Sequence, residues 1–207
     1  MAVTANQPRK GIREALLEAA SALMREQDTI DIGILDIAAR ARVNHGMIRY
    51  YFGSKEGMLL ALLERDVTHA LHELDSLFEL DVTPTERMRI HLSGIVDTYY
   101  RIPYLNRLFQ AMVRDASQER VRHIADELLK PVASAQERII RDGIASGEFR
   151  EVDPTLFYFN AIGAGDGLYS NRFTLSALFG GIPAADDALH ERYKRHTVET
   201  LQAGLLV

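Results

Sequence analysis

The sequence of 207 residues contains no cysteine. Without cysteine the chain cannot form disulfides, use a thiolate nucleophile or build the cysteine-based zinc and iron–sulfur sites. Long apolar runs are also missing: the longest aliphatic run, Met58 to Leu63, is far shorter than the roughly 20 residues that cross a bilayer. The first residues, MAVTANQPRKG, lack the apolar centre of a signal peptide. We therefore expect a cytoplasmic protein with no membrane partner.

A general surplus of basic charge is missing as well. The net charge is −5, whereas a nucleic-acid-binding domain usually carries a positive surplus. The charges are unevenly distributed, however. Residues 1–55 contain eight Lys and Arg against six Asp and Glu, and residues 56–207 contain sixteen against twenty-three. Any surface that binds nucleic acid is therefore expected in the first quarter of the chain.

Apolar residues recur at spacings of three and four along almost the whole chain, and alternating runs are scarce. This pattern predicts an all-α protein of about nine helices, with a small module followed by a larger one. Pro131 is expected to kink a long helix, and Asp153-Pro154 is a strong helix start. The expected helices span about 12–27, 34–40, 45–51, 54–80, 85–101, 104–115, 118–146, 154–179 and 185–204.

The most informative segment spans residues 35–52. Its two helices are too short to be stable alone, so they must pack on each other and on the first helix. Ile37 and Ile48 supply apolar contacts between them, and Asn44 is placed to cap the second helix. In a helix-turn-helix the first turn of the second helix contacts base edges. Here that turn presents His45, Gly46 and Met47.

A second sign of DNA binding lies at the start of the next helix. Ser54 is a good N-cap and Glu56 suits the positive end of the helix dipole, but Lys55 is unfavourable there by a few tenths of a kcal/mol. A lysine beside free backbone amides indicates an anion site, and a DNA phosphate is the natural anion. The same reasoning applies to the basic residues ahead of the first helix, Arg9, Lys10 and Arg13.

The run from Ile34-x-x-Ile37-Ala38 through Val43-Asn44 to Tyr50-Tyr51-Phe52-x-Ser54-Lys55-Glu56 resembles the tetracycline-repressor family of bacterial transcriptional regulators. The resemblance implies a helix-turn-helix domain over 9–53 and a helical sensor and dimerisation domain over 54–207, with no catalytic residues, cofactor or metal. The implied partners are a palindromic operator, a second copy of the chain and an unknown small-molecule inducer. The implied DNA contacts are Ile34, Leu35, Asn44, His45, Gly46, Met47, Arg49, Tyr50 and Lys55.

Two positions depart from the family pattern. Arg42 stands at the turn where glycine is usual, so it must adopt a left-handed backbone at about 1–2 kcal/mol or open the turn. Arg49 stands where a tyrosine is common, and arginine there can bind a phosphate or read a guanine. Both alternatives stay open from the sequence.

Assembly follows from how little DNA one helix can read. A single short recognition helix covers too few base pairs to select an operator, and two-fold dimers place half-sites about 34–36 Å apart or a multiple of that. The resemblance places the dimer face on the last two long helices. The candidate contacts are Leu168, Leu175, Leu189 and Leu201.

The inducer pocket is expected inside the larger domain, as an apolar cavity with a few orienting polar groups. Asp166 lies among small and apolar residues, so if buried it needs an arginine, a tyrosine hydroxyl or a ligand amine as partner. Aromatic stripes are equally compatible with ordinary core packing. The candidate lining residues are Tyr99, Tyr104, Phe109, Met112, Phe157, Asn160, Asp166, Tyr169 and Phe173.

Two other classes of function stay open. Asp66-x-x-His69 and Asp187-x-x-His190 resemble the Glu-x-x-His pairs of di-iron bundles, although the acid is Asp and no matching inward carboxylates are evident. A helical metalloenzyme is therefore one alternative, and an interaction module without DNA affinity is the other. Gly163-x-Gly165-x-Gly167 suggests a nucleotide loop but lacks its lysine, so close helix packing is favoured.

Overall fold

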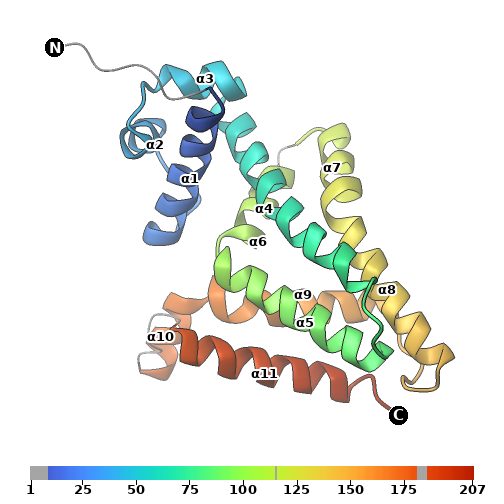
Figure 1. The fold of residues 1–207 in the computed structure, drawn as a ribbon. Coiled ribbons are helices and arrows are strands. Elements are labelled where there is room, and N and C mark those ends of the chain that lie inside the picture. Colours follow the sequence, from blue (N-terminus) through green and yellow to red (C-terminus); the bar gives the residue numbers. More distant parts are fainter. Residues whose placement is uncertain (1–8, 115, 181–185) are drawn as a thin grey trace.

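The structure, a computed structural model, describes residues 9–114, 116–180 and 186–207. In these ranges the regular elements are helices, so the all-α prediction is confirmed (Figure 1). An isolated β-bridge pairs Phe149 with Leu206 near the end of the chain. None of the described helices is both long and apolar enough to cross a membrane. The helices are α1 (Arg9–Gln27), α2 (Ile34–Ala41), α3 (Gly46–Phe52), α4 (Lys55–Leu77), α5 (Pro84–Arg101), α6 (Leu105–Arg114), α7 (Gln118–Ile124), the π-helical segment η1 (Ala125–Leu129), α8 (Lys130–Ala145), α9 (Pro154–Ser170), α10 (Arg172–Phe179) and α11 (Asp187–Ala203).

The long helix expected over 118–146 is present, but its irregularity is not a simple kink. α7 passes through η1 into α8, and Pro131 lies in the first turn of α8. Proline lacks an N–H and its ring clashes with the carbonyl four residues earlier, so a regular α-helix cannot continue through it. The wider π turn lies directly before the proline and accommodates it.

The single helix expected over 154–179 is wrong, because α9 ends at Ser170. Asn171 has φ −113° and ψ 15°, outside the α-helical values, and α10 begins at the next residue. The Asn171 side-chain amide donates a hydrogen bond to the Gly167 carbonyl at 3.0 Å. The asparagine thus satisfies one of the carbonyls that a helix end leaves without a partner, which supports the break.

The first hydrophobic core joins α1–α3 to the first half of α4 and to α6. Leu16 and Leu17 of α1 are fully buried, and Ile37 and Ile48 are buried as predicted. An ion pair between Arg40 and Glu26 fastens α2 to α1, with one N–O distance of 2.9 Å. The three helices therefore form one packed unit at the top of the molecule in Figure 1, with α4 leading away from it.

The second core surrounds α5, which packs against α8, α9 and α11. Met88, Leu92 and Val96 of α5 are buried there. α4 belongs to both cores, because Leu63 is buried in the first and Leu77 in the second. α11 forms an outer layer at the bottom of Figure 1, beside α10. This arrangement leaves a space between α4, α5, α6, α8 and α9 that becomes the cavity described below.

Candidate DNA-binding surface and ligand cavity

The turn between α2 and α3 keeps its closed geometry despite the arginine. Arg42 adopts the left-handed conformation, with φ 57° and ψ 39°. Its N–H donates to the Ala39 carbonyl at 3.1 Å, and the Val43 N–H donates to the Ala38 carbonyl at 3.0 Å. This pair of bonds is a Schellman ending, in which glycine is the preferred left-handed residue. Of the two alternatives from the sequence, the strained backbone is the one observed.

Asn44 caps α3 as expected. Its Oδ1 accepts a hydrogen bond from the Gly46 N–H at 2.8 Å, so α3 begins at Gly46 and His45 lies just before it. Asn44 and His45 are exposed, whereas Met47 is half-buried and packs against the first core. Of the three residues expected in the outward-facing first turn, Met47 is therefore the one that is partly withdrawn.

Both helices of the turn expose apolar side chains. Leu35, in the first turn of α2, has 69% of its surface exposed, and Tyr50 of α3 has 63%. Ile34 and Arg49 are exposed as well. Single exposed apolar residues are ordinary on protein surfaces, but here they accompany an exposed arginine on one helix-turn-helix. The surface can therefore offer both apolar and cationic groups to a duplex.

The lysine at the start of α4 has an acidic partner, Asp31 from the segment between α1 and α2, that the sequence analysis did not predict. Ser54 Oγ accepts from the Gly57 N–H at 3.0 Å, which confirms the N-cap. Lys55 Nζ lies 3.4 Å from Asp31 Oδ1, and the Asp31 side chain is 96% exposed. Such an exposed ion pair contributes little stability. Lys55 is thus available to a phosphate, but Asp31 competes for it.

The remaining basic residues, expected ahead of the first helix, lie within α1, which begins at Arg9. The Arg13 guanidinium lies 5.3 Å from the centre of the Phe52 ring, at a distance typical of a cation–π contact. The side chains of Arg9 and Lys10 lie outside the described part of the chain. Their expected phosphate contacts stay a prediction.

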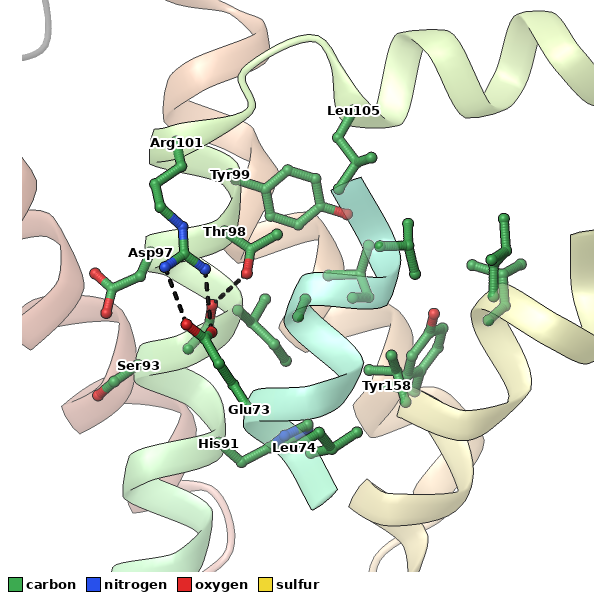
Figure 2. Close-up of a pocket in the computed structure, with 18 of the residues that line it drawn as sticks. Glu73, Leu74, His91, Ser93, Asp97, Thr98, Tyr99, Arg101, Leu105 and Tyr158 are labelled. Carbon is green, nitrogen blue, oxygen red and sulfur yellow. Dashed lines mark hydrogen bonds and ion pairs between the residues drawn. The ribbon is translucent and has the colours of Figure 1, made fainter. Parts of the chain in front are cut away.

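A cavity of about 560 Å³ lies between α4, α5, α6, α8 and α9 (Figure 2). Its volume falls in the range of small-molecule sites, and its lining is mostly apolar, which matches the usual composition of such sites. The apolar lining residues are Val67, Ala70, Leu74, Leu77, Ile90, Ile95, Tyr99, Leu105, Phe109, Leu128, Leu129, Val132, Tyr158, Phe159 and Ile162.

Of the expected pocket residues, Tyr99 and Phe109 line this cavity and the other described ones do not. Tyr104 and Met112 are buried in the first core, and Phe157 and Tyr169 in the second. Asn160 is exposed, Asp166 lies behind the lining, and the side chain of Phe173 is outside the described residues. On α9 the aromatic pair that reaches the cavity is Tyr158 and Phe159. The α9 residues that were predicted to line the cavity lie on the neighbouring face of that helix.

Asp166 finds its partners within the chain. Only 7% of its surface is exposed, and it accepts hydrogen bonds from Asn106 Nδ2 at 2.6 Å and from the Ser170 hydroxyl. The partners are therefore an amide and a hydroxyl from the chain rather than the expected arginine, tyrosine or ligand amine. Burial, with the nearby Asp166 carboxylate, raises the pKa of Tyr99 above its usual range.

The polar residues around the cavity were also missed, because the expectation followed the aromatic residues. The Arg101 guanidinium binds the Glu73 carboxylate through two bonds of 3.2 and 3.1 Å. The Thr98 hydroxyl donates to the Gly94 carbonyl at 2.8 Å (Figure 2). Asp97 is bound by Lys194 at 3.0 Å, and burial lowers the pKa of His91 to about 4.

The two Asp/His pairs behind the metalloenzyme reading have other partners. Asp66 is bound by Arg65 and by the Tyr104 hydroxyl, and the side chain of His69 lies outside the described residues. His190 bonds to Tyr169 and Asp97 at 2.7 Å each, rather than to Asp187. Asp97, His190 and Glu191 are close enough to share a cation. The Lys194 ammonium binds both of those carboxylates, so a cationic group already lies there.

A helix-turn-helix joined by α4 to a helical domain with an apolar cavity defines a DNA-binding regulator of the ligand-sensing class. The family model described as "Bacterial regulatory proteins, tetR family" matches residues 16–62. The model described as "Tetracyclin repressor-like, C-terminal domain" matches residues 81–207. The chain therefore belongs to the tetracycline-repressor family, as its motif predicted.

Relatives of known name are also transcriptional regulators. The chain is 28% identical over 186 residues to the transcriptional repressor NicS of Pseudomonas putida, covering 84% of this chain and 82% of that protein. It is 37% identical over 67 residues to a transcriptional repressor of Mycobacterium tuberculosis, covering 31% of this chain. That match spans only 36% of the length of the Mycobacterium protein.

Solved structures share the fold over nearly the whole chain. A TetR/AcrR-family regulator from Thermobifida fusca has a TM-score of 0.69 at 26% identity, covering 93% of this chain and 97% of that one. A regulator from Saccharomonospora viridis in complex with choline has a TM-score of 0.71 at 17% identity, covering 96% and 99%. FadR from Bacillus subtilis in complex with stearoyl-CoA has a TM-score of 0.69 at 20% identity, covering 92% of this chain and 98% of that one. The last two show likeness of fold alone.

Proposed function

We propose that this chain is a cytoplasmic repressor that binds a palindromic operator as a homodimer and leaves it when a small molecule enters the cavity. Residues of the α2–turn–α3 surface, with Lys55, contact the DNA in this proposal. The observation that carries the release step is that one segment, at the start of α6, takes part both in the cavity and in the contact with α1.

The start of α6 contacts both the cavity and the end of α1. Leu105, Asn106 and Phe109 line the cavity. On the same segment, the Arg107 guanidinium donates to the Asp28 carbonyl at 2.7 Å and binds the Asp28 carboxylate just beyond α1. A ligand that shifts α6 will therefore also shift the support of the DNA-binding helices. The size of the response equals the difference in ligand affinity between the two arrangements.

Tyr104 adds a second, buried attachment. Its hydroxyl donates to Asp66 Oδ2 at 2.7 Å and lies 2.8 Å from the hydroxyl of Ser21 on α1. Buried hydrogen bonds of this kind hold elements in one relative position, because leaving them unmade is costly. The attachment supports a rigid link between α6 and α1, through which movement at the cavity reaches the helix-turn-helix.

The proposed dimer rests on exposed apolar residues of the outer helices. Leu156 and Phe159 of α9 are 63% and 66% exposed, and Leu178 of α10 is exposed as well. The four leucines expected from the sequence are only half-buried, and Leu168 and Leu201 pack against the second core. We therefore assign the dimer contact to the outer surface of α9 and α10, with α11 beside them.

Ligand-bound relatives support a sensor role for the cavity. Proteins of this fold have been seen with choline and with stearoyl-CoA. These two molecules share no chemistry with each other, so neither is assigned to this chain. What they support is that this helical domain can hold a small molecule.

The test uses the full chain and two variants of Gly94. This glycine lines the cavity, and a Cβ built on it meets no atom within 4 Å. Gly94→Phe is therefore expected to fill the cavity, whereas the matched Gly94→Ala adds one methyl group and leaves it open. Both are compared with the wild type for duplex selection from a random library and for binding of prodan, an uncharged fluorescent naphthyl ketone.

We expect all three proteins to select the same palindromic duplex. Prodan should bind the wild type and Gly94→Ala, and it should fail to bind Gly94→Phe. If the wild type selects no duplex sequence, the repressor proposal is wrong. If Gly94→Phe binds prodan as well as the wild type does, the cavity is not the ligand site.

A further inference from the structure

Unpaired polar atoms lie at one end of the cavity. His91 of α5 lines the cavity and is only 5% exposed, and its Nε2 has no hydrogen-bond partner in the described chain. Gln136 of α8 is fully buried beside it, outside the cavity lining; its weak contact with His91 raises the His91 pKa, but neither of its side-chain polar atoms makes a well-formed hydrogen bond to the described residues. Figure 2 shows His91 near Leu74, at the end of the cavity away from Tyr99.

This arrangement is costly unless something binds it. A buried polar group left without a partner costs about 1–3 kcal/mol, and native proteins contain few of them. Here three such atoms lie together, and one of them, His91 Nε2, belongs to a residue that lines the apolar cavity. The second ring nitrogen of a neutral imidazole either donates or accepts a hydrogen bond. His91 can therefore bind a ligand oxygen that is either an acceptor or a donor, beside the amide of Gln136.

The charges around the cavity are already paired. Glu73 is bound by Arg101, and Asp97 by Lys194. His91 is held neutral near pH 7 because burial lowers its pKa to about 4, although the adjacent Gln136 side chain opposes this shift. A charged ligand group at the His91 end would lose its hydration without gaining a counter-ion.

We propose that the cavity takes an uncharged ligand with an apolar body and a single carbonyl or hydroxyl group, which binds His91 at the end of the cavity beside Gln136. This inference rests on the proposed function and names the ligand class. The apolar body lies against the aliphatic and aromatic lining, and the oxygen fixes the ligand's orientation. The bond to this oxygen gives His91 Nε2 the partner that it lacks among the described residues.

The test compares probes that share one apolar body. These are 2-acetylnaphthalene, 2-ethylnaphthalene, 2-naphthoate and 2-naphthylmethylammonium, each measured by displacement of prodan from the wild-type protein. The ketone should bind about tenfold more tightly than the hydrocarbon, as expected for one buried hydrogen bond that the hydrocarbon leaves unmade. The two charged probes should bind at least about tenfold more weakly than the ketone because their charge is desolvated without a partner.

Variants then locate the recognition. His91→Phe replaces the imidazole by an apolar ring, and the double variant His91→Phe/Gln136→Leu also removes the adjacent amide. Both variants should lose the preference for the ketone. His91→Asn, which keeps a hydrogen-bonding group, should retain part of it. The matched control is Ser93→Ala, because Ser93 lines the same cavity but its hydroxyl already donates to the Arg89 carbonyl at 2.8 Å. Ser93→Ala should keep the full preference.

The outcomes separate this inference from the proposed function. The inference is wrong if His91→Phe and the double variant both fold and keep the preference for the ketone. It is also wrong if a charged probe binds as tightly as the ketone. The proposed function would still stand in that case, provided that Gly94→Phe abolishes prodan binding. If Gly94→Phe binds prodan unchanged, the cavity is not the ligand site, so this inference and the release step of the proposed function both fail, whereas DNA binding is decided by the duplex selection.

Discussion

Arg42 shows how a single residue can depart from a family pattern without changing the local geometry. The left-handed backbone that the turn needs is found at φ 57°, and both hydrogen bonds of the helix ending are present. Glycine would adopt this conformation at lower cost, so the arginine carries about 1–2 kcal/mol of strain. Its exposed side chain adds one cation close to the recognition helix. If the proposed DNA contact is made through α3, this charge would lie near the phosphates and would offset part of the strain.

At the residue scale, His91 predicts a pH dependence of stability. Its pKa is about 4 in the folded chain and about 6.5 when unfolded, so the unfolded state binds the proton more readily. The free energy of unfolding should therefore fall as the pH drops below about 6.5, by about 2 kcal/mol between pH 7 and pH 5. Urea unfolding at both pH values measures this loss.

The control is a second histidine. His91→Phe should lose most of this difference between pH 7 and pH 5, whereas His196→Phe should keep it because His196 is exposed on α11. An equal pH dependence in the wild type and His91→Phe would show that His91 is not the group responsible.

Lys55 and Asp31 give a second residue-scale prediction, on DNA affinity. Lys55→Ala should weaken binding to all duplexes and make the slope of log affinity against log salt shallower by about one. Asp31→Asn should strengthen binding instead, because the exposed carboxylate lies 3.4 Å from the lysine and competes with phosphate. Fluorescence anisotropy across a salt series measures both effects. Unchanged affinity and slope in Lys55→Ala would exclude Lys55 as a phosphate contact.

At the element scale, the packing of α9 on α5 depends on one glycine. A Cβ on Gly165 would lie 2.7 Å from Ile95 Cγ2 and 3.2 Å from Tyr99 Cδ2. Gly165→Ala should therefore destabilise the fold by about 1–3 kcal/mol, the usual cost of overpacking a core. Gly94→Ala, in α5 with open space at its Cβ, should instead stabilise by up to about 1 kcal/mol through helix propensity. Urea unfolding that shows no cost for Gly165→Ala would contradict this close packing.

How far the sequence predicts an element depends on how local its determinants are. α2 and α3 match the expected ranges within one residue, and the caps at Asn44, Ser54 and Asp153 are as expected, because a cap involves only a few adjacent residues. The break at Asn171 was missed because the apolar spacing continues through it. An asparagine inside a helical pattern is a weak signal by itself.

The cavity was harder to predict because its lining depends on how helices far apart in the sequence face one another. On α9 a rotation of one residue separates Phe157, which is in the core, from Tyr158, which lines the cavity. Apolar content is similar on both faces of this helix, so periodicity cannot choose between them. His91 and Gln136 are 45 positions apart and meet only through the packing of α8 on α5. No local signal in the sequence could have paired them.

In the whole molecule, long helices connect the two cores: Ile124 of α7 and Leu128 of η1 lie in the first core, and Ile139 of the continuing α8 lies in the second. α4 belongs to both, and the segment at the start of α6 attaches to α1 through Arg107 and Tyr104. Arg65 of α4 adds ion pairs of 2.8 Å to Glu14 and Glu18 of α1. A change in the position of α4 or α6 therefore moves the helix-turn-helix as one body, because α1–α3 share a single packed core.

The proposed dimer can be tested on the outer surface of α9 and α10. Leu156→Glu and Leu178→Glu place a charge on exposed apolar residues that do not line the cavity, so each should give monomers in sedimentation at micromolar concentration. Operator affinity should then fall by about a hundredfold or more, because two linked half-site contacts become one. Leu80→Glu is the matched control: Leu80 is also an exposed leucine but lies between α4 and α5 rather than on α9 or α10. A Leu156→Glu or Leu178→Glu protein that stays dimeric and binds the operator normally would place the dimer contact elsewhere on the molecule.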